Sequence, residues 1–235
     1  ETGAPAVAQD VLDAESALVA DARAAAHHYA EAGDRDAVID QDAKTMSVRL
    51  RLRPGPPIAL AAPTFTGIDD IDEDFLRRRV DWEPGAAATP AAVRETNRAL
   101  VGTGLFRTVE VQLPETAPEG PATVPVEIVT EQRLHRTISA GVRFETDGGP
   151  GGDVAWEHRN FLGAGETFRA ALDADTLEQS LSASLRTPDF FGRSRSLLAE
   201  TEAVRETTDA FDSLAINARA GVEQRFTPEL VGSLG

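Results

Sequence analysis

Residues 137–165 have the sequence TISAGVRFETDGGPGGDVAWEHRNFLGAG, and they decide how the rest of the chain is interpreted. Apolar and polar side chains alternate in residues 137–145, which is the pattern of a β-strand with one apolar and one polar face. We expect the Gly-rich residues 147–152 to reverse the chain and residues 153–160 to form a second strand. Gly163 and Gly165 mark the next turn, which returns the chain to a third strand.

Alternation of this kind continues to the C-terminal residue. The expected strands are 137–145, 153–160, 166–174, 177–187, 195–206 and 211–226, with a seventh starting near Leu230. A soluble sandwich alternates in the same way, so the pattern alone leaves open whether the apolar face meets lipid or a protein interior. The strand lengths, and the several charges on each non-apolar face, favour a barrel with a polar lumen in a membrane.

The first 134 residues follow a different plan. We expect one or two helices in residues 6–32, ended by Gly33-Asp34, and then a hairpin of residues 37–40 and 46–53 that stops at Pro54–Pro57. A strand at 58–67 follows, and a short helix at 72–80 with Asp70 or Asp72 as its cap. A second helix starts at Thr89-Pro90, and strands at 106–113 and 123–133 complete the order strand–helix–helix–strand–strand.

Composition narrows the class of protein. The 235 residues include 39 acidic and 23 basic side chains, for a net charge of −16, and no basic stripe follows any element, so nucleic acid is not an expected partner. There is no Cys, which excludes disulfides and thiolate metal sites. No apolar run is long enough for a transmembrane helix. Because the chain opens at Glu1, we expect it to be processed or cut from a longer one.

No motif predicts an enzyme, a metal site or a cofactor. His27 and His28 are adjacent on an expected helix and point about 100° apart, so they are poorly placed to share an ion. The acidic run 69–74 lacks the ligand spacing of a calcium loop, and we interpret it as helix capping and solvation. Residues 148–152 (GGPGG) join two expected strands, so no helix follows to hold a phosphate. Trp156 is expected to face lipid or to anchor at its interface.

Short motifs carry a family resemblance over residues 6–235. Phe65-Thr66-Gly67, a two-helix stretch closing on Gly104-Leu105-Phe106, and the Val-rich strand after it resemble a polypeptide-transport-associated (POTRA) domain. Residues 50–56 (LRLRPGP) resemble the end of a preceding one. Residues 141–149 (GVRFETDGG), 156–165 (WEHRNFLGAG) and 188–192 (PDFFG) resemble the first barrel strands of outer-membrane assembly proteins in the BamA/TamA superfamily, with TamA as the nearest resemblance.

This resemblance implies an α+β POTRA fold followed by the N-terminal antiparallel strands of a truncated transmembrane β-barrel. The expected domains are the C-terminal part of a POTRA domain (1–55), a complete POTRA domain (56–134) and six to seven barrel strands (135–235). It implies assembly or insertion of β-barrel proteins or autotransporters at the bacterial outer membrane, with the POTRA domains in the periplasm. Expected partners are unfolded outer-membrane clients, outer-membrane lipid and a periplasm-spanning, TamB-like inner-membrane protein.

The resemblance also implies candidate residues. A barrel of this family opens at the seam beside its first strand, where a client strand adds through backbone hydrogen bonds. The candidate seam residues are Ile138, Ala140, Gly141, Val142 and Phe144, and the structural POTRA motif residues are Phe65, Gly67, Gly104, Leu105 and Phe106. Gly141 either weakens local packing or makes room for a neighbour.

Two functions from other classes remain open. One is a pore that secretes a passenger, as in two-partner secretion, and the other is a soluble periplasmic binding module built on a β-sandwich.

Overall fold

The computed structural model describes residues 7–146, 149–192, 194–208, 211–227 and 230–235. The chain forms two compact units. The first consists of Glu1–Gly67, Arg77–Gly102 and Thr108–Thr130, and the second of Ile68–Leu76, Thr103–Arg107 and Glu131–Gly235. Short segments from the middle of the chain therefore belong with the C-terminal strands.

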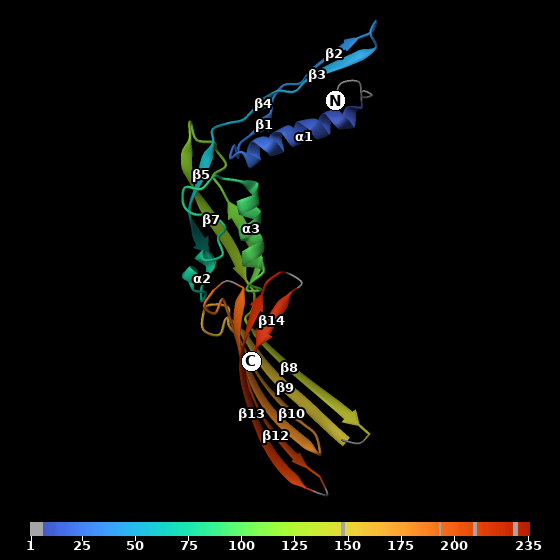
Figure 1. Ribbon diagram of the computed structural model, residues 1–235, viewed down its shortest axis with the longest axis vertical. Helices are drawn as coiled ribbons and strands as arrows, with labels where there is room; N and C mark the ends of the chain where they lie inside the picture. Colours follow the sequence, from blue (N-terminus) through green and yellow to red (C-terminus); the bar gives the residue numbers. More distant parts are fainter. Residues whose placement is uncertain (1–6, 147–148, 193, 209–210, 228–229) are drawn as a thin grey trace. The chain divides into compact units, whose positions relative to one another are not determined.

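The N-terminal part holds one helix and short strand pairs (Figure 1). Helix α1 spans Ala8–Ala24, β2 (Asp36–Asp40) pairs with β3 (Thr45–Arg49), and β1 (Glu31–Ala32) pairs with β4 (Leu52–Arg53). The expected helix end at Gly33 is wrong, because Ala26 adopts a φ of 71° and its carbonyl accepts the Ile58 amide at 3.0 Å. The expected strand at 46–53 is interrupted after Arg49, since the Arg51 carbonyl turns to accept the Gly33 amide at 2.8 Å.

A three-stranded sheet follows in the predicted order of elements. Strands β5 (Ile58–Thr66), β6 (Phe106–Gln112) and β7 (Ala122–Gln132) have the spatial order β5–β7–β6, with β5 and β7 parallel. Helix α3 (Pro90–Val101) begins as expected at Thr89, whose side chain accepts the Ala92 amide. Helix α2 (Glu73–Arg77) is shorter than the expected 72–80, and of the two expected caps Asp72 accepts the Asp74 amide at 2.8 Å.

The first unit has an apolar core. Large buried apolar side chains of β5, β7 and α3 form it, and these are Ile58, Leu60, Leu100, Val124, Val126 and Ile128. The Trp82 indole donates to the Ala61 carbonyl at 3.0 Å, and the Thr96 hydroxyl accepts the Asp81 amide at 2.8 Å. Buried polar groups in this core thus have partners.

Residues 136–234 form a seven-stranded antiparallel meander, drawn in Figure 1 as one curved sheet. Its strands, in spatial order as in sequence order, are β8 (Arg136–Glu145), β9 (Gly149–Arg159), β10 (Thr167–Ala174), β11 (Glu178–Pro188), β12 (Arg195–Thr207), β13 (Asp212–Arg225) and β14 (Val231–Leu234). All seven expected strands are present. Among the described residues, β8 and β14 are the two edge strands of this sheet and do not pair with each other.

The expected Gly-rich turn at 147–152 is wrong for residues 149–152. Residues 149–152 belong to β9 and pair with residues 142–145 of β8, while Asp147 and Gly148 lie outside the described residues. A Cβ on Gly151 would stand 3.0 Å from the Asp175 Cβ and 3.2 Å from the Arg143 Nε. Glycine is present here because neighbouring side chains cross the strand closely, and not because the chain turns.

Candidate functional site

The candidate seam strand β8 lies at an edge of the seven-stranded sheet. It pairs with β9 alone among the described residues, with Ile138 opposite Trp156 and Ala140 opposite Val154. The side chains of Ile138, Val142 and Phe144 are 75%, 95% and 79% exposed. The structure therefore places four of the five predicted seam residues on one face of an edge strand, with Gly141 on the other.

Gly141 makes room for a neighbour. A Cβ at this position would stand 2.5 Å from Oδ1 of Asp153, the residue directly opposite on β9. A side chain would have to displace that carboxylate. Of the two explanations for this glycine, the close approach of Asp153 is the one with a visible contact.

One face of the sheet is apolar over most of its area. The register aligns Val154, Leu172 and Leu181 across β9, β10 and β11, and continues through Ala203 to Ile216 on β13. Leu172 is 51% exposed and Ile216 is 72% exposed. Nothing in the described chain covers this face, so its side chains are open to the surroundings.

Charges on the apolar face of the sheet occur only near its ends in the described strands. On β12, Arg195 and Arg205 stand ten positions apart on the apolar face with no charge between them on that face, while Glu200 and Glu202 belong to the opposite face. At about 3.3 Å per residue this distance is about 33 Å, and a strand tilt of roughly 40° would reduce it to about 25 Å along the axis of a barrel. That height matches the apolar band of outer-membrane barrels.

The opposite face carries ion pairs. Arg143 on β8 contacts Asp173 at 2.5 and 2.6 Å, and Arg186 contacts Glu223 at 2.7 Å. Arg219 and Glu200 approach to 3.2 Å beside a hollow of about 250 Å³ that is also lined by Ser182, Ser184 and Asn217. Rows of paired charges are typical of the polar lumen side of a barrel strand.

The base of the sheet holds a dock that the sequence did not reveal. The turn 160–166 between β9 and β10 receives the segment 68–76 of the same unit. The Asn160 amide nitrogen donates to the Asp70 carbonyl at 2.7 Å, and the Asp72 backbone amide donates to the Gly163 carbonyl at 2.8 Å. His135, which precedes β8, places Nδ1 3.3 Å from the Asp70 carboxylate.

Buried polar groups give this dock its shape. Asn160 is 3% exposed with a φ of 75°, and its side-chain oxygen accepts the Gly165 amide at 2.9 Å. Glu166 is 5% exposed and accepts the Leu162 and Ala164 amides at 3.2 and 3.0 Å. A Cβ on Gly165 would stand 2.7 Å from the Phe75 ring. Hydrogen bonds within the turn 160–166 (NFLGAGE) thus shape a socket for segment 68–76, and glycine is required at position 165 because the Phe75 ring packs against it.

The POTRA motif residues have structural roles. Gly67 has a φ of 78°, and a Cβ there would stand 2.0 Å from the carbonyl oxygen of Thr130. The side-chain hydroxyl of Thr130 donates to the Thr66 carbonyl at 2.8 Å. Phe65 is half-buried with Arg77 5.9 Å above its ring. Gly104 has a φ of 73° and precedes Leu105 and Phe106, which are 1% and 2% exposed.

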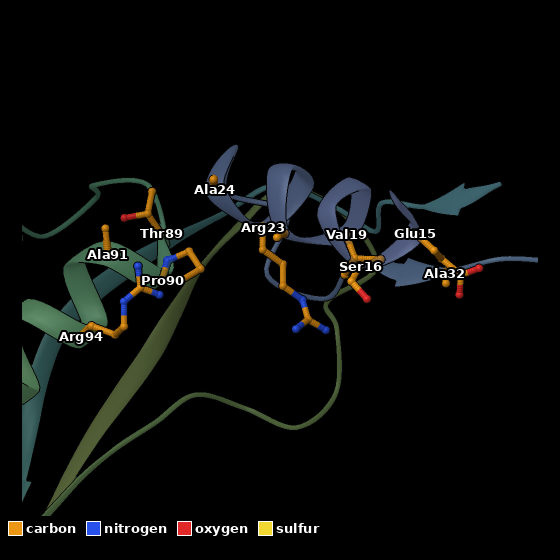
Figure 2. Close-up of a pocket in the computed structure, with 11 residues that line it drawn as sticks. Glu15, Ser16, Val19, Arg23, Ala24, Ala32, Thr89, Pro90, Ala91 and Arg94 are labelled. Atoms are coloured by element: carbon orange, nitrogen blue, oxygen red, sulfur yellow. The ribbon is translucent and has the colours of Figure 1, made fainter. Parts of the chain in front are cut away.

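A groove of about 720 Å³ lies in the first unit between α1 and the start of α3 (Figure 2). Arg23 and Arg94 line it together with Ser16 and Thr89. Arg23 donates to the Ala30 carbonyl at 3.1 Å. Glu15 also lines the groove and is paired with Arg35 at 2.8 Å.

Within the described ranges, no three histidine or acidic side chains group as metal ligands. The acidic run 69–74 divides between the cap at Asp72 and the contact of Asp70 with His135. Among those same residues, none of the helices combines the length and the apolar content that a membrane-crossing helix requires.

Comparison with known proteins places the fold. No family model matches the chain. The structure of BamA from Haemophilus ducreyi lacking POTRA domains 1–3 superposes on 95% of the chain with a TM-score of 0.78 at 18% identity. The chain has a BamA-like fold. CdiB from Escherichia coli matches 94% of it with a TM-score of 0.50 at 12% identity.

The match agrees with the fold class predicted from the sequence, an α+β POTRA fold followed by the first antiparallel strands of a β-barrel. The chain spans 43% of the matched BamA structure and 42% of the matched CdiB structure. The nearer resemblance to TamA stays a prediction, since these matches concern BamA and CdiB.

Proposed function

We propose that this chain is the POTRA-to-barrel segment of an outer-membrane assembly factor that inserts β-barrel proteins or autotransporters. Residues 1–55 are the C-terminal part of one POTRA domain, 56–134 a complete one, and 135–235 the first barrel strands. The protein then resides in the bacterial outer membrane with its POTRA domains in the periplasm. Its partners are unfolded outer-membrane proteins, lipid and a periplasm-spanning, TamB-like protein.

The observation that carries this proposal is the uncovered apolar face of the seven-stranded sheet. Val142 is 95% exposed and Ile216 is 72% exposed on it, and a soluble sandwich would bury both. The charge-free distance of about 25 Å on this face fits a bilayer core. Ion pairs on the other face, such as Arg143 with Asp173, suit a polar lumen.

The free edge of β8 supplies the site of action. An unfolded client strand carries backbone amides and carbonyls that cost several kcal/mol each if they enter lipid unpaired. Among the described residues the outer edge of β8 pairs with no strand, and in the proposed function this edge opens in the intact barrel to offer them hydrogen bonds that do not depend on client side chains. Client folding provides the driving force, so no cofactor or bond chemistry is required.

The test uses photo-crosslinking in cells that express the intact protein. The crosslinking residue replaces Val142 on β8, and a matched variant carries it at Leu181, which is on the same face, 58% exposed, and flanked by strands on both sides. We expect newly made outer-membrane proteins to be captured at position 142 and not at position 181.

Other outcomes separate the alternatives. Capture of only the protein's own last strand at position 142, at every client load, would identify a closed pore and favour secretion of a passenger. Equal capture of clients at both positions would mean that binding is to the apolar face and not to the edge.

A further inference from the structure

The polar face of the edge strand β8 has a gap at Gly141. Strand β8 lies at one edge of the seven-stranded sheet, with β9 as its only neighbour among the described strands (Figure 1). On the polar face of β8 the residues before and after the gap are Ser139 and Arg143. Because glycine has no side chain, the backbone of β8 is uncovered at position 141. A side chain that comes from a strand beyond the edge can lie across β8 there.

The carboxylate of Asp153 reaches into this gap from β9. Asp153 is directly opposite Gly141 in the register of the two strands. Its Oδ1 atom lies 2.5 Å from the place that a Cβ of residue 141 would occupy. The carboxylate therefore lies over the backbone of β8 rather than over its own strand, and the residue is exposed. A side chain that crosses β8 at position 141 would meet it.

The negative charge of Asp153 is not balanced by a neighbouring cation. The one basic side chain on the polar face of β8 is Arg143, which contacts Asp173 on β10 at 2.5 and 2.6 Å. Arg143 also contacts Glu145 at 3.1 Å and Asp175 at 3.4 Å. Among the described residues Asp153 has no ion-pair partner. The gap in β8 is thus bordered by a carboxylate that is available to a cation from outside the sheet.

We propose that Gly141 and Asp153 form a subsite for a lysine or arginine side chain of the strand that adds to β8. The inference rests on the proposed function, because it needs a client strand paired with this edge. It adds which side chain that strand carries on its polar face. Backbone hydrogen bonds hold any client strand, and the subsite favours one with a basic residue opposite Gly141.

The length of the client side chain decides which residues fit. Residues directly opposite each other on paired strands have Cβ atoms about 4.5–5.5 Å apart, on the same face of the sheet. A client residue opposite Gly141 therefore begins one strand away from the gap. Lysine and arginine are long enough to cross the gap and reach the Asp153 carboxylate, whereas alanine and serine are too short. A glutamate at this position would instead meet the like charge of Asp153.

Competition between strand peptides tests the subsite. The full-length protein is folded into phosphatidylcholine vesicles with a photo-crosslinking residue in place of Val142, on the apolar face of β8. The two competing peptides alternate apolar and polar residues over about ten positions, the length of a barrel strand. One has lysine and the other glutamate at the same polar position, and this position is moved along the peptide.

The readout is the largest ratio of captured lysine peptide to captured glutamate peptide over these positions. We expect a ratio of about five, because an exposed opposite-charge pair favours one peptide and a like-charge pair disfavours the other. Asp153→Asn should reduce the ratio toward one, and Asp153→Lys should reverse it in favour of the glutamate peptide. Glu202→Gln is the matched control, since it removes a carboxylate from the same face on β12, away from the edge, and should leave the ratio unchanged.

The outcomes separate the subsite from the proposed function. If peptides are captured at position 142 with the same ratio in Asp153→Asn as in the unmodified protein, the subsite is wrong while the edge remains a client site. An equal fall of the ratio in Glu202→Gln and Asp153→Asn would assign the preference to net charge and would also overturn the subsite. If no peptide of either charge is captured at position 142, the edge does not bind strands and the proposed function fails with it.

Discussion

The two sheets of this chain share one sequence pattern and place their apolar side chains in opposite surroundings. In the POTRA sheet and its helices, Leu60, Leu100 and Ile128 are fully buried. In the seven-stranded sheet, Val142 and Ile216 stand almost entirely open. Alternation therefore specifies that a strand has two unlike faces, and the environment decides what covers the apolar one.

The difference has an energetic meaning. Apolar surface removed from water stabilises a fold by about 25 cal/mol per Å², and the POTRA core gains this within its own chain. The seven-stranded sheet gains it only from material outside the described chain. The predictions below break or sharpen this contrast, from the largest expected effect to the smallest.

Truncating a core side chain tests the sheet of β5, β7 and β6, whose apolar face is buried within the chain. Leu100→Ala should lower the free energy of unfolding of the POTRA region by about 2–5 kcal/mol, because a fully buried leucine leaves a cavity. Urea titration followed by the fluorescence of Trp82 measures this. Val101→Ala, one position on and 48% exposed, is the control and should change stability by less than about 0.5 kcal/mol. Equal effects at the two positions would mean that α3 does not pack as described.

A charged substitution on the apolar face tests the environment of the seven-stranded sheet. Leu172→Arg should destabilise the protein in lipid vesicles by about 2–4 kcal/mol, because the arginine would enter the bilayer core. The matched change, Val101→Arg on the exposed end of α3, should be within about 0.5 kcal/mol. Equilibrium unfolding in vesicles gives both values. A neutral Leu172→Arg would place this face in water and abolish the contrast.

The dock at the base of the sheet, where turn 160–166 contacts segment 68–76, is a buried contact within a unit whose sheet is otherwise exposed. Asn160→Gly keeps the φ of 75° without strain and removes the side chain that bonds Asp70 and Gly165, at a cost of about 1–3 kcal/mol. Hydrogen exchange should accelerate at Asp72 and Gly165. Asn97→Ala, which loses a 2.7 Å bond to the Val109 carbonyl, should accelerate exchange near β6 instead. Unchanged protection at Asp72 in Asn160→Gly would argue against the socket.

The smallest effect concerns pH. Burial lowers the pKa of His28 below its ordinary value, and Arg23 lowers it further. The folded state therefore favours neutral His28, so its contribution to stability is present above pH of about 6.5 and declines as the pH falls below it. Protection factors of the amides near residues 23–30, which are corrected for the slower intrinsic exchange at low pH, should fall from pH 7.5 to 5.5, and His28→Gln should weaken this dependence. The same fall in His28→Gln would assign it to another group.

Much of the fold was predictable because its signals are local. Alternation located all seven strands of the large sheet, and Thr89-Pro90 located the start of α3. The Gly-rich residues 149–152 were wrongly predicted as a turn because glycines are typical of turns, whereas Gly151 lies in β9 and accommodates Arg143 and Asp175. The left-handed Ala26 that ends the first helix also has no local signal in its sequence.

For the candidate site, too, local features were predictable and contacts between distant residues were not. The family resemblance predicted β8 as the first strand of the sheet, and its role as a seam stays a prediction. The contact of the 160–166 turn with residues 68–76 was not predicted, because Asp70 and Asn160 meet across 90 residues of sequence. Sequence reasoning gave Asp72 a capping role and missed the contact of its amide with Gly163. A buried asparagine followed by Gly-x-Gly was the available signal, and its partner was not deducible from spacing.

The contact between turn 160–166 and segment 68–76 also determines the order in which parts of the chain can fold during synthesis. A chain that emerges from its N-terminus presents Asp70 and Phe75 long before Asn160 and Gly165 exist, and closing so long a loop is slow and entropically costly. The beginning of α2 must therefore wait, incompletely covered, until the first barrel hairpin arrives. Burial of Phe75 is in this way made to depend on the hairpin of β9 and β10, and a chain that stops before residue 166 would leave this side chain exposed.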